Sequence, residues 1–191
     1  MLRTSLKLIF CTAIIGSACS STGPKVVERL EGYDDTPDWA TGAKVMWSEE
    51  EDMFFANITT MAENTRPDAC MKAAATSARS EMLKYIKSNI SESGQINDED
   101  VAGDPAFESY TSFLAQGSAS GARVVNRYYD KRVFKTDAGI ETIKMRCAAK
   151  IAVNKKVLAK QLNDALTKKT KGNSKVREKL QDTQNKFLDS L

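Results

Sequence analysis

Cys19 is the residue whose chemistry the sequence indicates most directly. It follows a basic start, a short apolar run over residues 8–15 and three small residues at positions 16–18. This order of charged, apolar and small residues is typical of an export signal. A thiol at the first position after the cut can be diacylated, and two or more acyl chains hold a protein stably on a membrane. We therefore expect residues 1–18 to be a lipoprotein signal peptide and Cys19 to carry lipid.

An ordinary signal peptidase offers an alternative, because Gly16 and Ala18 also satisfy its requirement for small residues. The product would then be an exported protein with an unmodified Cys19. The small polar residues that follow favour the anchor, and we interpret residues 19–36 as a lipidated tether. In a bacterium with two membranes, Ser20 occupies the position where Asp is associated with inner-membrane retention. We therefore expect attachment to the outer membrane.

Cys70 and Cys147 are the two cysteines that remain once Cys11 is lost with the signal and Cys19 is acylated. Export would place them in an oxidising compartment, where a disulfide can form. The bond requires that their Cα atoms approach within about 7 Å. The alternative is a pair of buried free thiols, since cysteine is among the most buried residue types. The sequence leaves both open.

Histidine is absent from the chain, and this narrows the chemistry that the protein can perform. It removes Ser-His-Asp and Cys-His catalytic arrangements and most zinc sites. Without residues 1–18 the formal net charge falls from +3 to +1, which is not the balance of a nucleic-acid-binding protein. We predict no catalytic residues, no metal site, no cofactor and no nucleic-acid partner. A pair of close carboxylates is the route to catalysis that the sequence leaves open.

A long hairpin is the clearest structural prediction, and it positions Cys147. Residues 142–153 alternate between apolar and polar side chains, which is typical of a strand. Residues 123–135 are rich in Val, Tyr and Phe and predict the partner strand, with a turn that contains Gly139 between the two. We expect one face of this hairpin to lie on the core and the other in water.

An alanine-rich helix positions Cys70. Thr65 and Pro67 indicate its start, and the apolar periodicity continues to about residue 90. A strand over residues 53–62 precedes it, and a second helix is predicted to begin at Asp104. The predicted class is α+β: an antiparallel sheet of at least three strands, with the alanine-rich helix and the C-terminal helices packed on it. We assign this domain to residues 37–171.

The C-terminal part of the chain predicts two helices, and residues 172–191 form the second of them. Val176, Leu180 and Phe187 lie on one narrow apolar stripe of this helix, among polar and charged side chains. Such a stripe suits docking on the domain or pairing with another helix. We predict partner contact through these three residues, and we expect the core to fold without the helix.

Trp39 is a further candidate for partner contact, since exposed tryptophans make good interface anchors. The alternative is that it covers the edge of the core. Nine Lys and Arg residues between positions 155 and 179 indicate contact with anionic lipid or wall polymer. A solvated helix face, or pairing with acidic residues in the region 28–52, explains the same charges.

The order of these elements resembles a known bacterial family. Pro37-Asp38-Trp39, a strand, a capped alanine-rich helix, a second helix, a long hairpin and a closing helix are similar to the LPP-twenty family of small outer-membrane lipoproteins. A similar domain stands at the N-terminus of flagellar assembly protein T. The resemblance covers about residues 36–166 and implies an envelope location and a non-catalytic, partner-binding role. The chain departs from the family pattern because residues 53–62 lack a glycine near the end of the strand.

The sequence therefore predicts a non-catalytic envelope lipoprotein that acts as a structural or accessory binding module, with a flagellar assembly as one setting. Its partners are the membrane, through the N-terminal lipid, and a protein of the envelope. One alternative is a lipoprotein that regulates peptidoglycan synthesis. Another is an envelope enzyme that works through carboxylates. A deep pocket with two close carboxylates would favour the enzyme, and a filled interior would favour binding.

Overall fold

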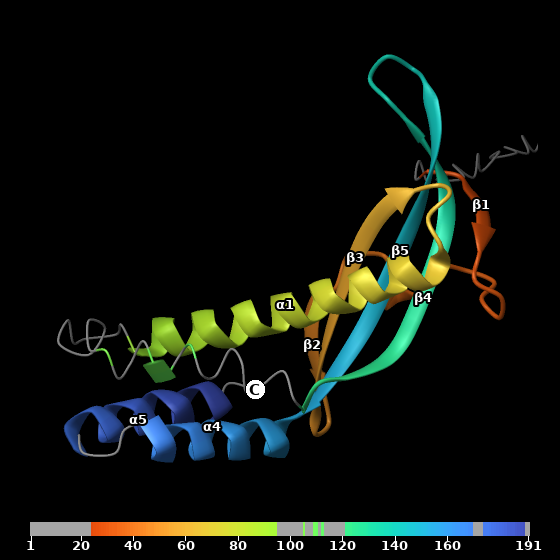
Figure 1. Ribbon diagram of the computed structural model, residues 1–191. Helices are drawn as coiled ribbons and strands as arrows, with labels where there is room; N and C mark the ends of the chain where they lie inside the picture. Colours follow the sequence, from red (N-terminus) through yellow and green to blue (C-terminus); the bar gives the residue numbers. More distant parts are fainter. Residues whose placement is uncertain are drawn as a thin grey trace, which may run out of the picture.

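The computed structural model describes residues 24–94, 105, 109–110, 112, 121–169 and 174–189. Its centre is a five-stranded antiparallel sheet with the strand order β1-β4-β5-β3-β2. Helices cover one face and one end of this sheet (Figure 1), so the predicted α+β class is confirmed. The strands are β1 Val26–Arg29, β2 Met46–Glu49, β3 Asp52–Ala62, β4 Arg123–Lys135 and β5 Glu141–Asn154.

The predicted hairpin is present as β4 and β5, which are the two longest strands. Their register runs from the pair Lys135 and Glu141 at the turn to Arg123 and Ala152 at the base. Gly139 has a φ of +76° in the turn and donates its backbone N–H to the carbonyl of Thr136. A left-handed residue in a tight hairpin turn favours glycine. The predicted strand at 53–62 is confirmed as β3.

The alanine-rich helix is α1, Pro67–Gly94, and it packs on the inner face of the sheet. Ala74, Ala75 and Ala78 are buried along it, and such small side chains let a helix approach a sheet closely. In Figure 1, α1 runs past the end of the sheet and lies over the C-terminal helices. Those helices are α4, Lys155–Lys169, and α5, Ser174–Asp189.

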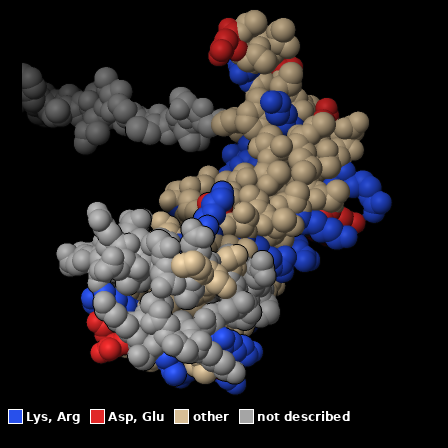
Figure 2. Space-filling model, turned by 60° about the vertical axis from the view of Figure 1, so that its left-hand side comes forward, with Lys and Arg blue, Asp and Glu red and all other residues tan. Residues whose placement is uncertain are grey.

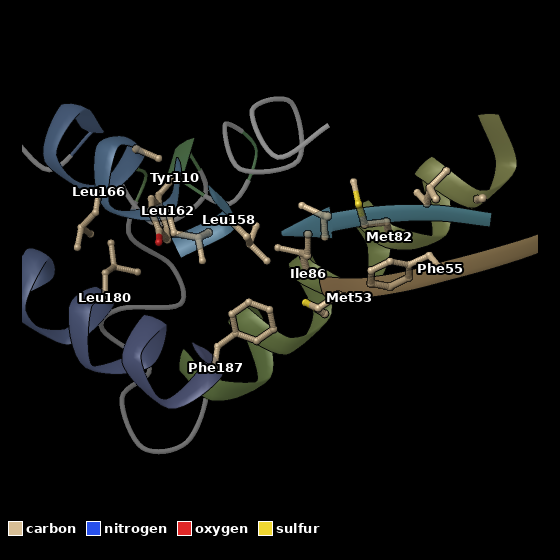
Figure 3. Close-up of a cluster of buried hydrophobic side chains, with 14 residues drawn as sticks. Met53, Phe55, Met82, Ile86, Tyr110, Leu158, Leu162, Leu166, Leu180 and Phe187 are labelled. Atoms are coloured by element: carbon tan, nitrogen blue, oxygen red, sulfur yellow. The ribbon is translucent and has the colours of Figure 1, made fainter. Parts of the chain in front are cut away.

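The main core lies where the sheet, α1, α4 and α5 meet. Figure 3 shows Ile86 of α1, Leu158 of α4 and Phe187 of α5 pointing into one apolar interior. Met53 and Phe55 close it from β3, and both side chains are almost wholly buried. Burial of this kind is the main favourable contribution to folding. The interior is thus filled by side chains from elements spread over most of the described chain.

The segment interpreted as a tether is partly folded, which corrects the boundary predicted at residue 36. β1 pairs with β4, and Leu30 and Tyr33 then pack on the outer face of the sheet. A short 3-10 helix, η1, Asp38–Ala40, continues this covering layer. The layer also corrects the prediction that the second hairpin face lies in water, because Tyr128 and Ala148 are buried on that side.

Two predictions fall wholly or mostly outside the described residues. The signal peptide and Cys19 precede Pro24, where the description begins. The helix predicted at Asp104 is described only at residues 105, 109–110 and 112, all of them helical. One of these, Tyr110, is fully buried in the main core.

Candidate functional site

A disulfide joins Cys70 at the start of α1 to Cys147 near the middle of β5, with the Cα atoms 5.8 Å apart. Both residues are fully buried beside Ala74, Ala149 and Met145. Cys147 lies on the inner face of the sheet because the alternation of β5 points it towards α1. The alternative of two buried free thiols therefore does not hold in the structure.

A buried ionic group fastens the N-terminal layer to the outer face of the sheet. Asp130 of β4 is fully buried, and its two carboxylate oxygens accept hydrogen bonds from Nε and Nη2 of Arg132 at 2.9 and 2.6 Å. The hydroxyl of Tyr128 donates a third hydrogen bond to Asp130 at 3.0 Å. Nη1 of Arg146 lies 3.7 Å from the same carboxylate. A buried carboxylate with this many donors is well compensated for its loss of water.

The two arginines of this group reach the covering segment directly. Arg132 donates to the hydroxyl of Thr36 at 2.8 Å, and Arg146 donates to the backbone carbonyl of Ala40. The hydrogen bond to Asp130 raises the pKa of Arg132, whereas burial lowers the pKa of Arg146, against the attraction of Asp130. The group links the sheet to residues 92 to 106 positions earlier in the chain. Its role is to hold the N-terminal layer in place.

An aromatic group, which we define as Trp39, Trp47 and Phe54, surrounds the ammonium of Lys150 on the same outer face. The distances from Nζ to the three ring centroids are 5.9, 5.9 and 5.1 Å. Trp47 and Phe54 stack on each other at 5.5 Å, and Trp47 also donates its indole N–H to Glu49. Each contact lies within the range in which a cation is attracted to a ring face. Lys150 thus already occupies the position that a cationic ligand would need.

Trp39 is half-buried and packs against the small outer cluster of Ala40, Tyr128 and Ala148. This placement matches the alternative in which it covers the edge of a core. The ammonium of Lys150 lies 5.9 Å from the centroid of its ring. Trp39 therefore stabilises the N-terminal layer, and its role in partner contact stays a prediction.

An open hollow of about 890 Å³ beside this group contains the acidic turn between β2 and β3. Its lining includes four consecutive carboxylates, at positions 49–52, which are candidates for general acid catalysis. Glu51 accepts a hydrogen bond from Lys156 at 2.5 Å, and this contact lowers the pKa of Glu51. Asp52 is held by Arg123 and by the amide of Asn154. A general acid needs a raised pKa, so the pairing of Glu51 acts in the wrong direction.

The contact between Lys156 and Glu51 also bears on the basic C-terminal run. It shows one lysine of that run paired with the acidic region near the N-terminus, as one of the sequence interpretations expected. Both side chains are well exposed, at 77% and 62%, so the pair contributes little to stability. Contact of the other basic residues of this run with anionic lipid or wall polymer stays a prediction.

The helix predicted to contact a partner is instead part of the core. Leu180 and Phe187 are each only 1% exposed, and they pack with Leu162, Met82 and the other core residues. The side chain of Val176 lies outside the described residues. The assignment of Leu180 and Phe187 to partner contact is therefore wrong, because the apolar stripe is covered by α1 and α4 of the same chain. Docking on the domain was one of the two arrangements that the stripe allowed.

The sequence reasoning missed the buried group around Asp130 and the cluster around Lys150. Tyr128, Asp130 and Arg132 alternate along β4 and so share one face, which was a usable signal. Charged residues at strand spacing normally indicate a face in water, and the covering segment that buries them is distant in sequence. Lys150 gave no signal, because its aromatic neighbours come from three separate elements.

Comparison with protein-family models, with curated proteins and with solved structures finds no match for this chain. Within the described ranges, no helix is long and apolar enough to cross a bilayer. The same residues contain no group of three or more Cys, Asp or Glu side chains placed to hold a metal ion.

Proposed function

We propose that this protein is an exported lipoprotein of the bacterial envelope, anchored through Cys19, that acts by binding and not by catalysis. The resemblance to the LPP-twenty family supports a structural or accessory role at the outer membrane. The proposal includes a protein partner in the envelope, and a flagellar assembly is one setting in which such a domain serves.

The observation that carries the proposal is the disulfide between Cys70 and Cys147. Disulfides persist in oxidising compartments and are rare where thiols are kept reduced. Export is also what the charged, apolar and small segments before Cys19 predict. Two unrelated features of the chain, one in its first residues and one in its core, thus favour the same compartment.

The arrangement of the interior supports binding over catalysis. The main core is filled by apolar side chains from β3, β5, α1, α4 and α5. The acidic hollow is open, and the carboxylates of Glu51 and Asp52 are engaged by Lys156, Arg123 and Asn154. Carboxylates held in this way are suited to fixing a turn. They are less suited to exchanging protons with a substrate.

Replacing the acylated thiol tests the anchor directly. Cys19→Ser removes the only sulfur that the proposal assigns to lipid, so labelling with a radioactive fatty acid should be lost and the protein should leave the membrane fraction. Cys11→Ala is the matched control, because it removes a cysteine within the signal segment and should leave both readouts intact. Unchanged labelling and sedimentation of the Cys19→Ser variant would refute the lipoprotein assignment.

A further inference from the structure

The end of the hairpin formed by β4 and β5 projects from the domain. β3 pairs with β5 only as far as Ala62 opposite Lys144, and the last contact of the N-terminal strand region is the N–H of Val133 with the carbonyl of Lys25. Beyond these points, in the described part of the chain, the hairpin continues without a third strand over residues 134–143, and Val133 marks its base. Figure 1 shows this projecting hairpin rising well above the rest of the sheet.

The projecting hairpin exposes apolar side chains that the domain cannot cover. Ile140 is 62% exposed and Ile143 is 37% exposed. Val133 lies opposite Ile143 and is partly exposed beside it. An isolated two-stranded hairpin is marginally stable in water, and exposed apolar side chains grouped at its end are suited to contact with an apolar surface.

The projecting hairpin carries few charges: one base and two acids, for a net charge of −1. Lys135 pairs with Glu141 at 3.1 Å, and Asp137 is the remaining acid in the turn. Figure 2 shows a narrow extension at the top of the molecule on which a few acidic and basic side chains lie among uncharged ones. A surface with exposed apolar residues and a net charge of only −1 suits contact with the interfacial region of a zwitterionic bilayer, where the buried apolar area supplies the binding free energy.

The chain leaves the fold in the direction of this tip. β1 is antiparallel to β4, and β4 runs towards the turn. The backbone before Val26 therefore heads towards the end of the hairpin. Lys25, the residue just before β1, lies level with Val133, at the base of the projection. Any anchor upstream of Lys25 is thus attached at the same end of the molecule as the hairpin.

The length of chain between the anchor and the fold limits how far the two can separate. Six residues lead from Cys19 to Lys25, and they span at most about 20 Å when fully extended. Five residues lead from Val133 to Ala138, and a strand of that length extends about 17 Å. The projecting hairpin is therefore almost as long as the extended segment from Cys19 to Lys25. Its tip can reach the surface in which the acyl chains are embedded.

We infer that the projecting hairpin docks on the lipid surface of the membrane that holds Cys19, with Ile140 and Ile143 entering the interface. This rests on the proposed anchor. The short tether keeps the tip at a high effective concentration near the bilayer, so a weak contact suffices. The docked hairpin and the acyl chains together fix the orientation of the domain, with α4 and α5 directed away from the bilayer.

The test uses residues 19–191 with Cys19→Ser and an N-terminal hexahistidine tag. This chain contains every described element of the fold, and with no natural histidine only the tag binds nickel. It is held on phosphatidylcholine vesicles that contain a nickel-chelating lipid. The tag replaces the acyl chains, so the result does not depend on whether cells acylate Cys19. An environment-sensitive dye is attached through Ala138→Cys at the tip or through Lys160→Cys on α4.

We expect a blue shift and a several-fold rise in emission for the dye at position 138 and no change at position 160. The double variant Ile140→Ser/Ile143→Ser should abolish the response. Val45→Ser/Met46→Ser is the matched control, because these residues are similarly exposed, at 51% and 36%, and lie at the start of β2, the edge strand opposite β1 and away from the hairpin turn. This control should keep the response.

Three results would overturn the inference. The dye at position 138 could stay in water, both dyes could respond alike, or the response could survive loss of the two isoleucines. A tip that stays in water but forms a crosslink to an envelope protein in cells would assign the hairpin to a protein partner instead. Failure here with normal acylation of Cys19 in cells would leave the anchor standing, so the two proposals are separable.

Discussion

Asp130 and Arg132 form a bidentate ion pair on the outer face of the sheet, with N–O distances of 2.9 and 2.6 Å. Asp130 is fully buried and the Arg132 side chain is only 15% exposed. Such a pair can add little net stability by itself, but removing one partner leaves the other charge buried and uncompensated. The intact pair therefore changes the free energy of unfolding little, whereas loss of either partner should lower it strongly.

Replacing the acid of this pair should detach the N-terminal layer. Asp130→Ala leaves Arg132 and Arg146 without their common carboxylate, and the expected loss in free energy of unfolding is about 3–5 kcal/mol. Urea unfolding followed by circular dichroism measures it. Asp137→Ala, in the exposed hairpin turn, is the control and should change the value by less than about 0.5 kcal/mol. Equal effects of the two substitutions would show that the buried pair has no special role.

The disulfide predicts a redox-dependent stability. Cys70 and Cys147 are 77 positions apart, so the bond closes a long loop and should stabilise the fold by about 2–4 kcal/mol. Reductant should lower the urea midpoint of the natural protein and leave that of Cys70→Ala/Cys147→Ala unchanged. Two alkylatable thiols in unreduced protein from the envelope, in addition to any at Cys19, would contradict the bond.

The last helix is expected to be essential for folding. Phe187 is almost wholly buried, and Phe187→Ala should cost about 3–5 kcal/mol through lost burial and the cavity left behind. Lys186→Ala, on the exposed face of the same helix, should be nearly neutral. A chain that ends at Gly172 loses both Leu180 and Phe187, and its thermal transition should be lost or greatly lowered. A truncated form with an unchanged melting temperature would support the expectation from the sequence that the core folds without α5.

Tyr110 predicts a specific dependence of stability on alkaline pH. Burial raises the pKa of its phenol, which also donates a hydrogen bond to Oε1 of Gln184 at 2.8 Å. The unfolded chain releases this proton near pH 10, whereas the folded protein retains it. The contribution of Tyr110 is therefore complete below about pH 10 and declines as the pH rises further.

Tyr110→Phe isolates that contribution. The difference in free energy of unfolding between the natural protein and Tyr110→Phe should be constant from pH 7 to about pH 9 and should shrink above about pH 10. Urea unfolding at each pH provides the measurement. A difference that stays constant to pH 11 would show that the phenol titrates alike in the folded and unfolded chains.

The hairpin and α1 could be predicted because their signals are local. Alternation along residues 142–153, a glycine in the turn, and a capped apolar periodicity are each visible within one element. β1 and β2 are only four residues long, and too short for periodicity to show. β1 also takes its strand partner from β4, about a hundred positions later. Strand pairing at that distance is a property of the assembled sheet.

The errors at the candidate site have the same origin. The sequence of β4 predicts that the face with Asp130 is exposed to water. The folded N-terminal layer, which is distant in sequence, buries this face. Leu180 and Phe187 form a stripe that is equally suited to a partner or to the domain. The choice depends on whether α1 extends far enough beyond the sheet to meet it, and α1 does extend that far. Burial by distant elements is therefore the information that the sequence lacked.

The mass of the N-terminal peptide from the membrane-bound protein shows whether Cys19 carries lipid. We predict a peptide that begins at Cys19 and carries a diacylglyceryl group on sulfur, with a third acyl chain on the amine where the cell adds one. Alkaline hydrolysis should remove the ester-linked chains and shift the mass accordingly. A peptide that begins at Cys19 with a free thiol, or one that retains residues 1–18, would contradict the lipoprotein assignment.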